Sequence, residues 1–142
     1  MSNAEKEGIY AEYIKKYTTM ALATASPSGD LDCSTVYFAL LEDGNLVIAT
    51  DTTTSKAANM DLSGRFAATL DNGTPMGVKM NGTAEKLGHP DTVLATRSAL
   101  LERIPAIKPF FDNPNIAFFR LSPDQRFVIN FAWGINWKLS VD

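Results

Sequence analysis

The sequence has few of the residues that cross-link a chain or bind metal. Its 142 residues include one cysteine, Cys33, and one histidine, His89. A single cysteine excludes an internal disulfide and suits a reducing cytoplasm. One cysteine and one histidine are too few for a Cys/His metal cluster. We therefore expect a cytoplasmic protein without a metal site.

Long apolar runs and a basic surface are also missing. No apolar run approaches the ~20 residues of a membrane-spanning helix, and the first residues are polar, unlike a signal peptide. The formal net charge is −3, which argues against general nucleic-acid or anionic-membrane binding, because both need a basic face. Hydrophobic residues make up 45% of the chain and charged residues 20%. These values are typical of a single globular domain, which we expect to span residues 1–142.

Three segments have the patterns of helices. Apolar residues recur three and four positions apart between residues 5 and 17. Small and polar residues over 55–62 predict a short second helix. His89 and Pro90 predict the start of a third helix, which ends at Pro105 and is followed by one further turn at 106–111.

The remaining segments are rich in β-branched, aromatic and small residues and are separated by turns. We expect strands at 19–25, 31–41, 46–50, 66–70, 76–87, 116–121 and 127–131, with a turn at 122–125 between the last two. Short connections favour an antiparallel sheet, and about seven strands in so short a chain should close into a barrel that removes exposed edges. Residues 1–18 would then carry the N-terminal helix and residues 132–142 a C-terminal tail.

The stretch 46–60 is the strongest candidate for a binding site. It begins as an apolar strand, continues through hydroxyl residues from Thr52 to Ser55, and becomes a helix with Lys56 in its first turn. Hydroxyls, free backbone N–H groups and a cation at one point can hold a phosphate. The alternative is a purely structural role, in which the hydroxyls only cap the helix and Lys56 is a solvated surface residue.

Five motifs in this order resemble the pyridoxamine 5′-phosphate oxidase-like flavoproteins, the FMN-binding split barrels. They are residues 20–24 with the Pro27/Gly29 turn, residues 34–38, residues 46–50, the helix start at 55–60, and residues 77–85. The resemblance covers about residues 10–130. It implies a mainly β fold, an antiparallel split β-barrel with flanking helices, in a homodimer that binds two FMN molecules in grooves between the subunits.

The resemblance also implies roles for individual residues. Thr50, Ser55 and Lys56 match phosphate-binding positions, and Thr54 beside them is a helix cap or a further hydroxyl donor. The strand that runs along the isoalloxazine ring, where backbone groups usually bond the polar edge of the ring, is matched by Ser34, Thr35, Val36 and Tyr37.

Three further residues are assigned by the resemblance. Lys79 matches a strand close to the dimer groove. Trp133 and Trp137 are candidates for the aromatic residue that C-terminal strands of the family often bring near the ring, and equally for dimer-packing residues. No catalytic side chain is assigned.

The chain departs from the family pattern in charge. It has no lysine or arginine between Lys16 and Lys56, where the true oxidase supplies an arginine and a further basic residue. A phosphate monoester carries about −1.5 to −2 charges, and Lys56 with a helix N-terminus of ~0.5 charge leaves part of this unmatched. Arg65, or Lys79 from a second subunit, is a candidate for the rest. A second phosphate clamp is missing, so we do not expect oxidation of pyridoxamine 5′-phosphate.

The preferred hypothesis is an FMN-dependent oxidoreductase that exchanges electrons with a small-molecule substrate or electron donor. The cofactor would carry the redox chemistry, so no side-chain nucleophile or acid–base pair is expected. One alternative is a deazaflavin-dependent reductase. Another is a carrier of flavin or haem without turnover, for which His89, Cys33, the tyrosines and the methionines are the possible haem ligands.

Overall fold

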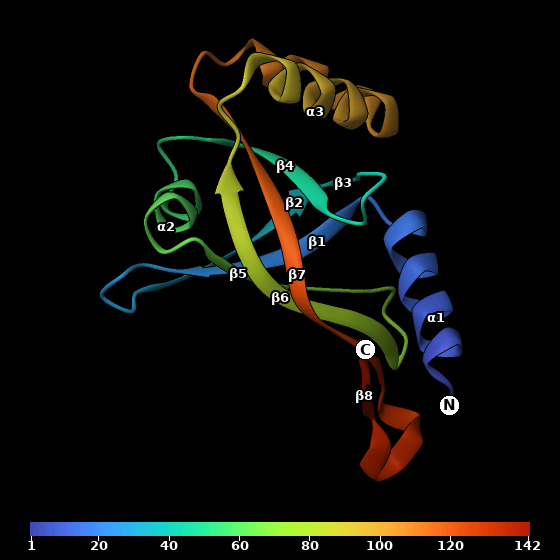
Figure 1. Cartoon of the computed structure of the whole chain (residues 1–142). Helices are drawn as coiled ribbons and strands as arrows, with labels where there is room; N and C mark the ends of the chain where they lie inside the picture. The colour runs from blue at the N-terminus through green and yellow to red at the C-terminus, as the bar shows by residue number, and fades with distance from the viewer.

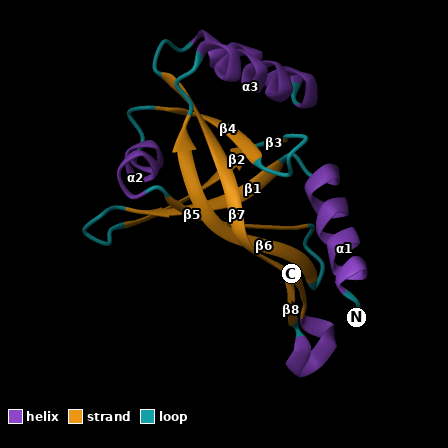
Figure 2. Cartoon of the chain, in the orientation of Figure 1, coloured by secondary structure: helices purple, strands orange, loops and turns teal.

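One strongly curved antiparallel sheet organises the computed structural model, which describes residues 1–142 (Figure 1). The elements are, in chain order, α1 (Asn3–Lys16), β1 (Thr19–Ala25), β2 (Leu31–Tyr37), β3 (Ala39–Leu40), β4 (Leu46–Asp51), α2 (Ser55–Ser63), β5 (Arg65–Asp71), β6 (Met76–Lys86), α3 (Pro90–Arg103), the 3-10 helix η1 (Pro105–Asp112), β7 (Ile116–Asn130), the 3-10 helix η2 (Phe131–Asn136) and β8 (Lys138–Val141). The helices lie around the outside of the curved strands (Figure 2).

The sheet has the strand order β2-β1-β5-β6-β7-β4-β3, and β8 adds to β7. Every neighbouring pair is antiparallel. The two ends of this order, β2 and the β3–β4 pair, do not bond to each other, so the barrel stays split. The predicted antiparallel split barrel with flanking helices is therefore confirmed.

Two apolar clusters occupy the two faces of the sheet. The inner cluster fills the barrel with side chains such as Phe38, Ile48 and Phe119, which are no more than 1% exposed. The outer cluster packs α3 and η1 on the back of β4 and β7 through residues that include Val47 and Phe118. Successive residues of a strand point to opposite faces, so β4 is buried on both sides.

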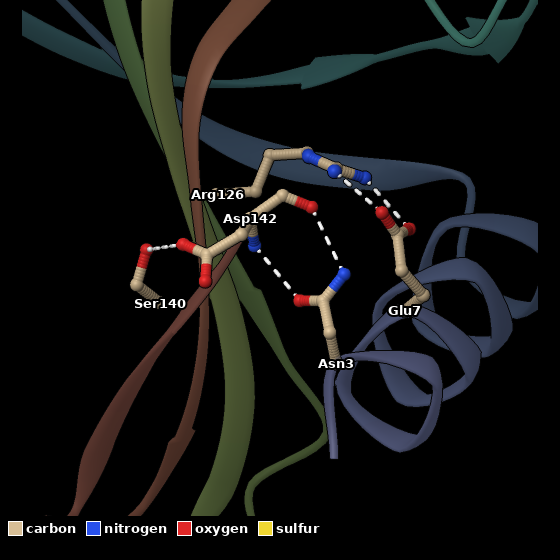
Figure 3. A network of polar contacts seen from close by, with 5 residues as sticks. All are labelled: Asn3, Glu7, Arg126, Ser140 and Asp142. Atoms are coloured by element: carbon tan, nitrogen blue, oxygen red, sulfur yellow. Dashed lines mark hydrogen bonds and ion pairs between the residues drawn. The ribbon is translucent and has the colours of Figure 1, made fainter.

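Polar contacts fasten α1 to the rest of the molecule (Figure 3). Arg126 of β7 donates two hydrogen bonds to the Glu7 carboxylate, at 2.6 and 2.8 Å, and these hold the pKa of Glu7 below its usual range. Asn3 exchanges two hydrogen bonds with the backbone of Asp142. At the other end of α1, Arg103 of α3 donates to backbone carbonyls of the last turn and the residue that caps it.

Two strand predictions were wrong. Residues 116–130 form one continuous strand, β7, because Pro123 is not in a turn but opposite Gly82, where the pairing with β6 shifts register, and Phe131 already belongs to η2. A proline without an N–H group is tolerated at such a bulge. The predicted strand 31–41 is divided at Phe38, because β2 pairs with β1 whereas β3 pairs with β4.

The C-terminal residues 132–142 contain most of η2 and all of β8, which pairs with β7 from Arg126 to Ile129. In Figure 1 this segment extends away from the barrel at the lower end of β7. The end of the chain therefore extends the sheet.

Candidate functional site

The split in the barrel contains a cavity of about 350 Å³, which lies within the range of small-molecule sites, roughly 300–1,000 Å³. β2 pairs only with β1, and β3 pairs with β4 only at Leu46 and Val47. One edge of β2 and the edge of β4 from Ile48 to Asp51 therefore have no neighbouring strand. Such edges present unpaired N–H and C=O groups, so backbone groups are available to a ligand in the split.

Three parts of the chain line this cavity: β2, the segment that runs from β4 into α2, and η1. The lining residues are Thr35, Val36 and Tyr37; Ala49, Thr50, Asp51, Thr54 and Lys56; and Ala106, Ile107 and Phe110. The second group places hydroxyls and a lysine together. The third group is apolar, so the cavity has a polar part and an apolar part.

Thr54 connects the polar part to the start of α2. Its side chain accepts a hydrogen bond from the Ala57 N–H as the N-cap, and its hydroxyl donates to the Asp51 carbonyl at 2.7 Å. The Thr50 hydroxyl, which is almost fully buried, lies 3.3 Å from the Thr54 hydroxyl. The N–H groups of Ser55 and Lys56 have no acceptor in the chain, as expected for the first turn of a helix. Thr54 therefore both caps α2 and lines the cavity.

Asp51 brings a negative charge to the same part of the cavity. Its carboxylate accepts hydrogen bonds from the N–H and hydroxyl of Thr53 and from the side-chain amide of Asn113, at 2.7–2.8 Å. Those bonds, and to a smaller extent the charge of Lys56, lower the pKa of Asp51. Lys56 and Asp51 are the charged residues of the lining, so its formal charge sums to zero.

Six of the predicted cofactor residues meet at this cavity: Thr35, Val36, Tyr37, Thr50, Thr54 and Lys56. Two of their sequence neighbours do not line it. The Ser34 hydroxyl is buried without a hydrogen-bond partner, opposite Leu22 in the sheet. The Ser55 side chain is exposed at the first position of α2.

The remaining predicted residues lie elsewhere in the same chain. Lys79 is on the outer face of the sheet, with its ammonium 5.3 Å from the centre of the Phe127 ring. Trp137 stacks on Phe131 with ring centres 5.3 Å apart in the C-terminal extension, and Trp133 packs against the inner cluster. Within one chain, neither Lys79 nor either tryptophan lines the cavity.

Sequence reasoning missed the wall that η1 provides. It predicted a turn at 106–111, but nothing in a local pattern shows which distant strands such a turn will face. Asp51 was missed as well, although it directly precedes the hydroxyl run. Because Asp51 lies between Thr50 and Thr52, the sequence already indicated a negative charge beside the predicted phosphate site.

Other features of the structure bear on alternative sites. His89 caps α3 by accepting the Asp91 N–H at its Nδ1 atom and lies outside the cavity. No three His, Cys, Asp or Glu side chains are grouped so that they could hold a metal ion. No helix has the length and apolar character needed to cross a membrane.

A larger cavity, about 450 Å³, lies between α1 and the β3–β4 turn. Its one basic residue, Arg126, is already held by Glu7, and Asp43 adds a second carboxylate to the lining. This cavity has no cation free for a phosphate, so the smaller cavity in the split is the better candidate.

The fold is a split barrel with a cavity between its two free strand edges. A family model described as pyridoxamine 5′-phosphate oxidase matches residues 8–130 of the chain. The chain therefore belongs to the pyridoxamine 5′-phosphate oxidase family, as its motifs predicted.

Solved structures share the fold. A conserved hypothetical protein from Mycobacterium tuberculosis is 23% identical, with a TM-score of 0.74 over 92% of this chain and 85% of that protein. A haem-binding protein from Mycobacterium smegmatis is 21% identical, with a TM-score of 0.76 over 99% of this chain but only 57% of its own length. The haem storage protein HutZ from Vibrio cholerae is 17% identical, with a TM-score of 0.77 over 86% and 93%. A comparison with curated proteins found no match.

Proposed function

We propose that the cavity in the split binds FMN and that the protein is an FMN-dependent oxidoreductase of the cytoplasm, acting on a small molecule. The observation that carries this proposal is the meeting of Thr50, Thr54 and Lys56 with the free edge of β2 at one cavity. Family membership supports it, because the matched family is defined by an oxidase.

Each part of the cavity would have a distinct task. The Thr50 hydroxyl, the free N–H groups of Ser55 and Lys56, and the Lys56 ammonium would hold the phosphate. Thr54, whose one hydroxyl proton goes to the Asp51 carbonyl, would keep the start of α2 in position beside them. The unpaired edge of β2 at Thr35–Tyr37 would offer backbone groups to the polar edge of the ring. The flavin supplies the electron-transfer chemistry when bound, and the chain positions it and limits its contact with water.

The neutral lining supports a second part of the proposal, that two copies of the chain form the complete site. A phosphate monoester carries about −1.5 to −2 charges, which Lys56 alone does not balance beside Asp51. The outer face of the sheet has a shallow hollow of about 370 Å³ over Ala21, Ala23 and Ala67, with Lys79 at its edge. We propose that a second copy packs on this face and that Lys79 or Arg65 completes the charge balance.

Haem binding without turnover is the second candidate, because two of the structural neighbours are described as haem proteins. Tyr37 is the only lining residue of a kind that ligates haem iron. The haem hypothesis therefore predicts a Soret band on haem addition that is lost in Tyr37→Phe. A Soret band lost in His89→Ala instead would place haem outside the split.

The proposal is tested by titrating the purified chain with FMN and following flavin absorbance and fluorescence. We expect saturable binding that weakens at least tenfold in Lys56→Ala, because a charge-assisted hydrogen bond to phosphate contributes roughly 1.5–3 kcal/mol. Lys15→Ala, on the exposed face of α1, is the matched control and should bind as the wild type does.

Turnover distinguishes an enzyme from a carrier. Repeated oxidation of NADH or NADPH by the FMN complex in air, with dioxygen reoxidising the reduced flavin, would support the oxidoreductase, whereas bound flavin that is never reduced would support a carrier. If the wild type does not bind FMN but binds a deazaflavin cofactor, the deazaflavin-dependent reductase takes the place of this proposal.

A further inference from the structure

The 3-10 helix η1 forms a wall of the cavity that none of the phosphate motifs includes. We propose that this wall selects ligands with a flat aromatic body, and that Phe110 is the residue that determines the selectivity. The inference rests on the proposed function, because it concerns the ligand of the same cavity.

The position of η1 is fixed by its own packing, independently of any ligand. Ile107 and Phe111 are each only 7% exposed and belong to the outer apolar cluster. The centres of the Phe111 ring and the Phe118 ring of β7 are 5.6 Å apart. The Arg97 guanidinium lies 5.1 Å from the centre of the Phe111 ring. Asn113, directly after η1, donates to Asp51 beside the polar part of the cavity. Contacts with β7, Arg97 and Asp51 therefore hold η1 in place.

Phe110 is the large apolar side chain that this fixed wall leaves accessible. It is 38% exposed and lines the cavity, whereas its neighbour Phe111 is buried on the sheet. A 3-10 helix has three residues per turn, so Phe110 lies on the same side of η1 as Ile107, which also lines the cavity. Adjacent residues of the Phe-Phe pair thus have different tasks, one anchoring the helix and the other facing the ligand space.

A second aromatic ring lines the cavity from a different element. Tyr37 of β2 is 49% exposed. Aromatic rings favour offset-stacked or edge-to-face contacts with other rings, and Phe110 and Tyr37 offer such contacts to a flat heteroaromatic ring. The Thr50 hydroxyl, the free N–H groups at the start of α2 and Lys56 are suited to an anionic tail on the same ligand. A sugar phosphate without an aromatic ring would use the polar part only.

Three probes separate these two parts of the site. FMN has an aromatic ring system and a phosphate, riboflavin has the ring system but no phosphate, and ribose 5-phosphate has a phosphate but no aromatic ring. In Phe110→Ala we expect roughly tenfold weaker binding of both flavins, in line with the strength of an aromatic contact, and unchanged binding of ribose 5-phosphate. Phe110→Leu, which keeps apolar volume but no ring, should fall between Phe110→Ala and the wild type. Isothermal titration calorimetry of the full chain measures all three probes.

Two variants serve as controls. Lys108→Ala changes an exposed residue of η1 that does not line the cavity and should bind all three probes as the wild type does. Lys56→Ala should weaken FMN and ribose 5-phosphate but leave riboflavin binding unchanged. A thermal melt of each variant shows whether η1 has remained folded.

Wild-type flavin affinity in both Phe110→Ala and Phe110→Leu would overturn the inference and leave the proposed function standing. Equal losses for flavins and ribose 5-phosphate would also overturn it, because they would indicate a general disturbance of the cavity. A wild type that binds neither flavin would contradict the proposed function together with the inference.

Discussion

Among single residues, Thr54 is the one whose side chain both caps a helix and lines the cavity. It caps α2, bonds the Asp51 carbonyl and lines the cavity. A cap needs only a hydroxyl that reaches the N–H groups of the first turn. In this chain the same hydroxyl also lies 3.3 Å from that of Thr50, which makes the pair part of the cavity wall.

Replacing Thr54 by alanine should therefore affect stability and binding together. Loss of an N-cap costs about 1 kcal/mol of unfolding free energy, which urea unfolding measures, and FMN affinity should fall in the same variant. Thr54→Ser retains the hydroxyl and should restore most of both quantities. A Thr54→Ala chain that is destabilised but binds FMN with wild-type affinity would show that the residue is a cap only.

Among the helices and strands, local sequence patterns predicted the features that local interactions determine. The starts of α2 and α3 followed from Thr54 and His89, whose side chains cap them. The division of 31–41 and the continuity of β7 depend on which distant strand each residue meets, which a local pattern does not contain. For the same reason the local pattern of 46–60 could indicate a candidate site, whereas no local pattern could indicate the wall formed by η1.

The pairing of β6 with β7 at the register shift depends on the absence of a side chain at Gly82. A Cβ atom at this position would overlap the backbone of Ser122 and lie 3.0 Å or less from Pro123 and Asp124. Gly82→Ala should lower the unfolding free energy by roughly 1–3 kcal/mol, the usual cost of overpacking. The matched control is Gly8→Ala in α1, where a Cβ meets open space and alanine should stabilise the helix by roughly 0.5–1 kcal/mol. Equal effects of the two variants on urea unfolding would contradict this account.

For the molecule as a whole, the exposed outer face of β1 and β5 is a surface to which the proposed single-chain site assigns no role. Its alanines form the hollow beside Lys79, and Leu31 at the adjoining edge strand is 86% exposed. Large and exposed apolar surfaces commonly mark interaction sites. A second copy on this face would cover the alanines and bring further cations near the neutral cavity.

This arrangement predicts a dimer in light scattering after size-exclusion chromatography. Ala23→Arg places a long charged side chain in the hollow and should shift the molar mass to that of one chain, with weaker FMN binding because the second copy is lost. Leu94→Arg, on an exposed face of α3, should leave the mass unchanged. A wild type that is monomeric at all concentrations, yet binds FMN, would show that one chain forms the complete site.

A two-dimensional NMR titration of the isotopically labelled chain with FMN shows whether the split of the barrel is the flavin site. If FMN binds in the split, the backbone amide signals that shift belong to Thr35–Tyr37, Thr50–Lys56 and η1. Shifts confined instead to residues around the larger cavity, such as Glu7, Asn45 and Arg126, or no shifts at saturating FMN, would contradict it.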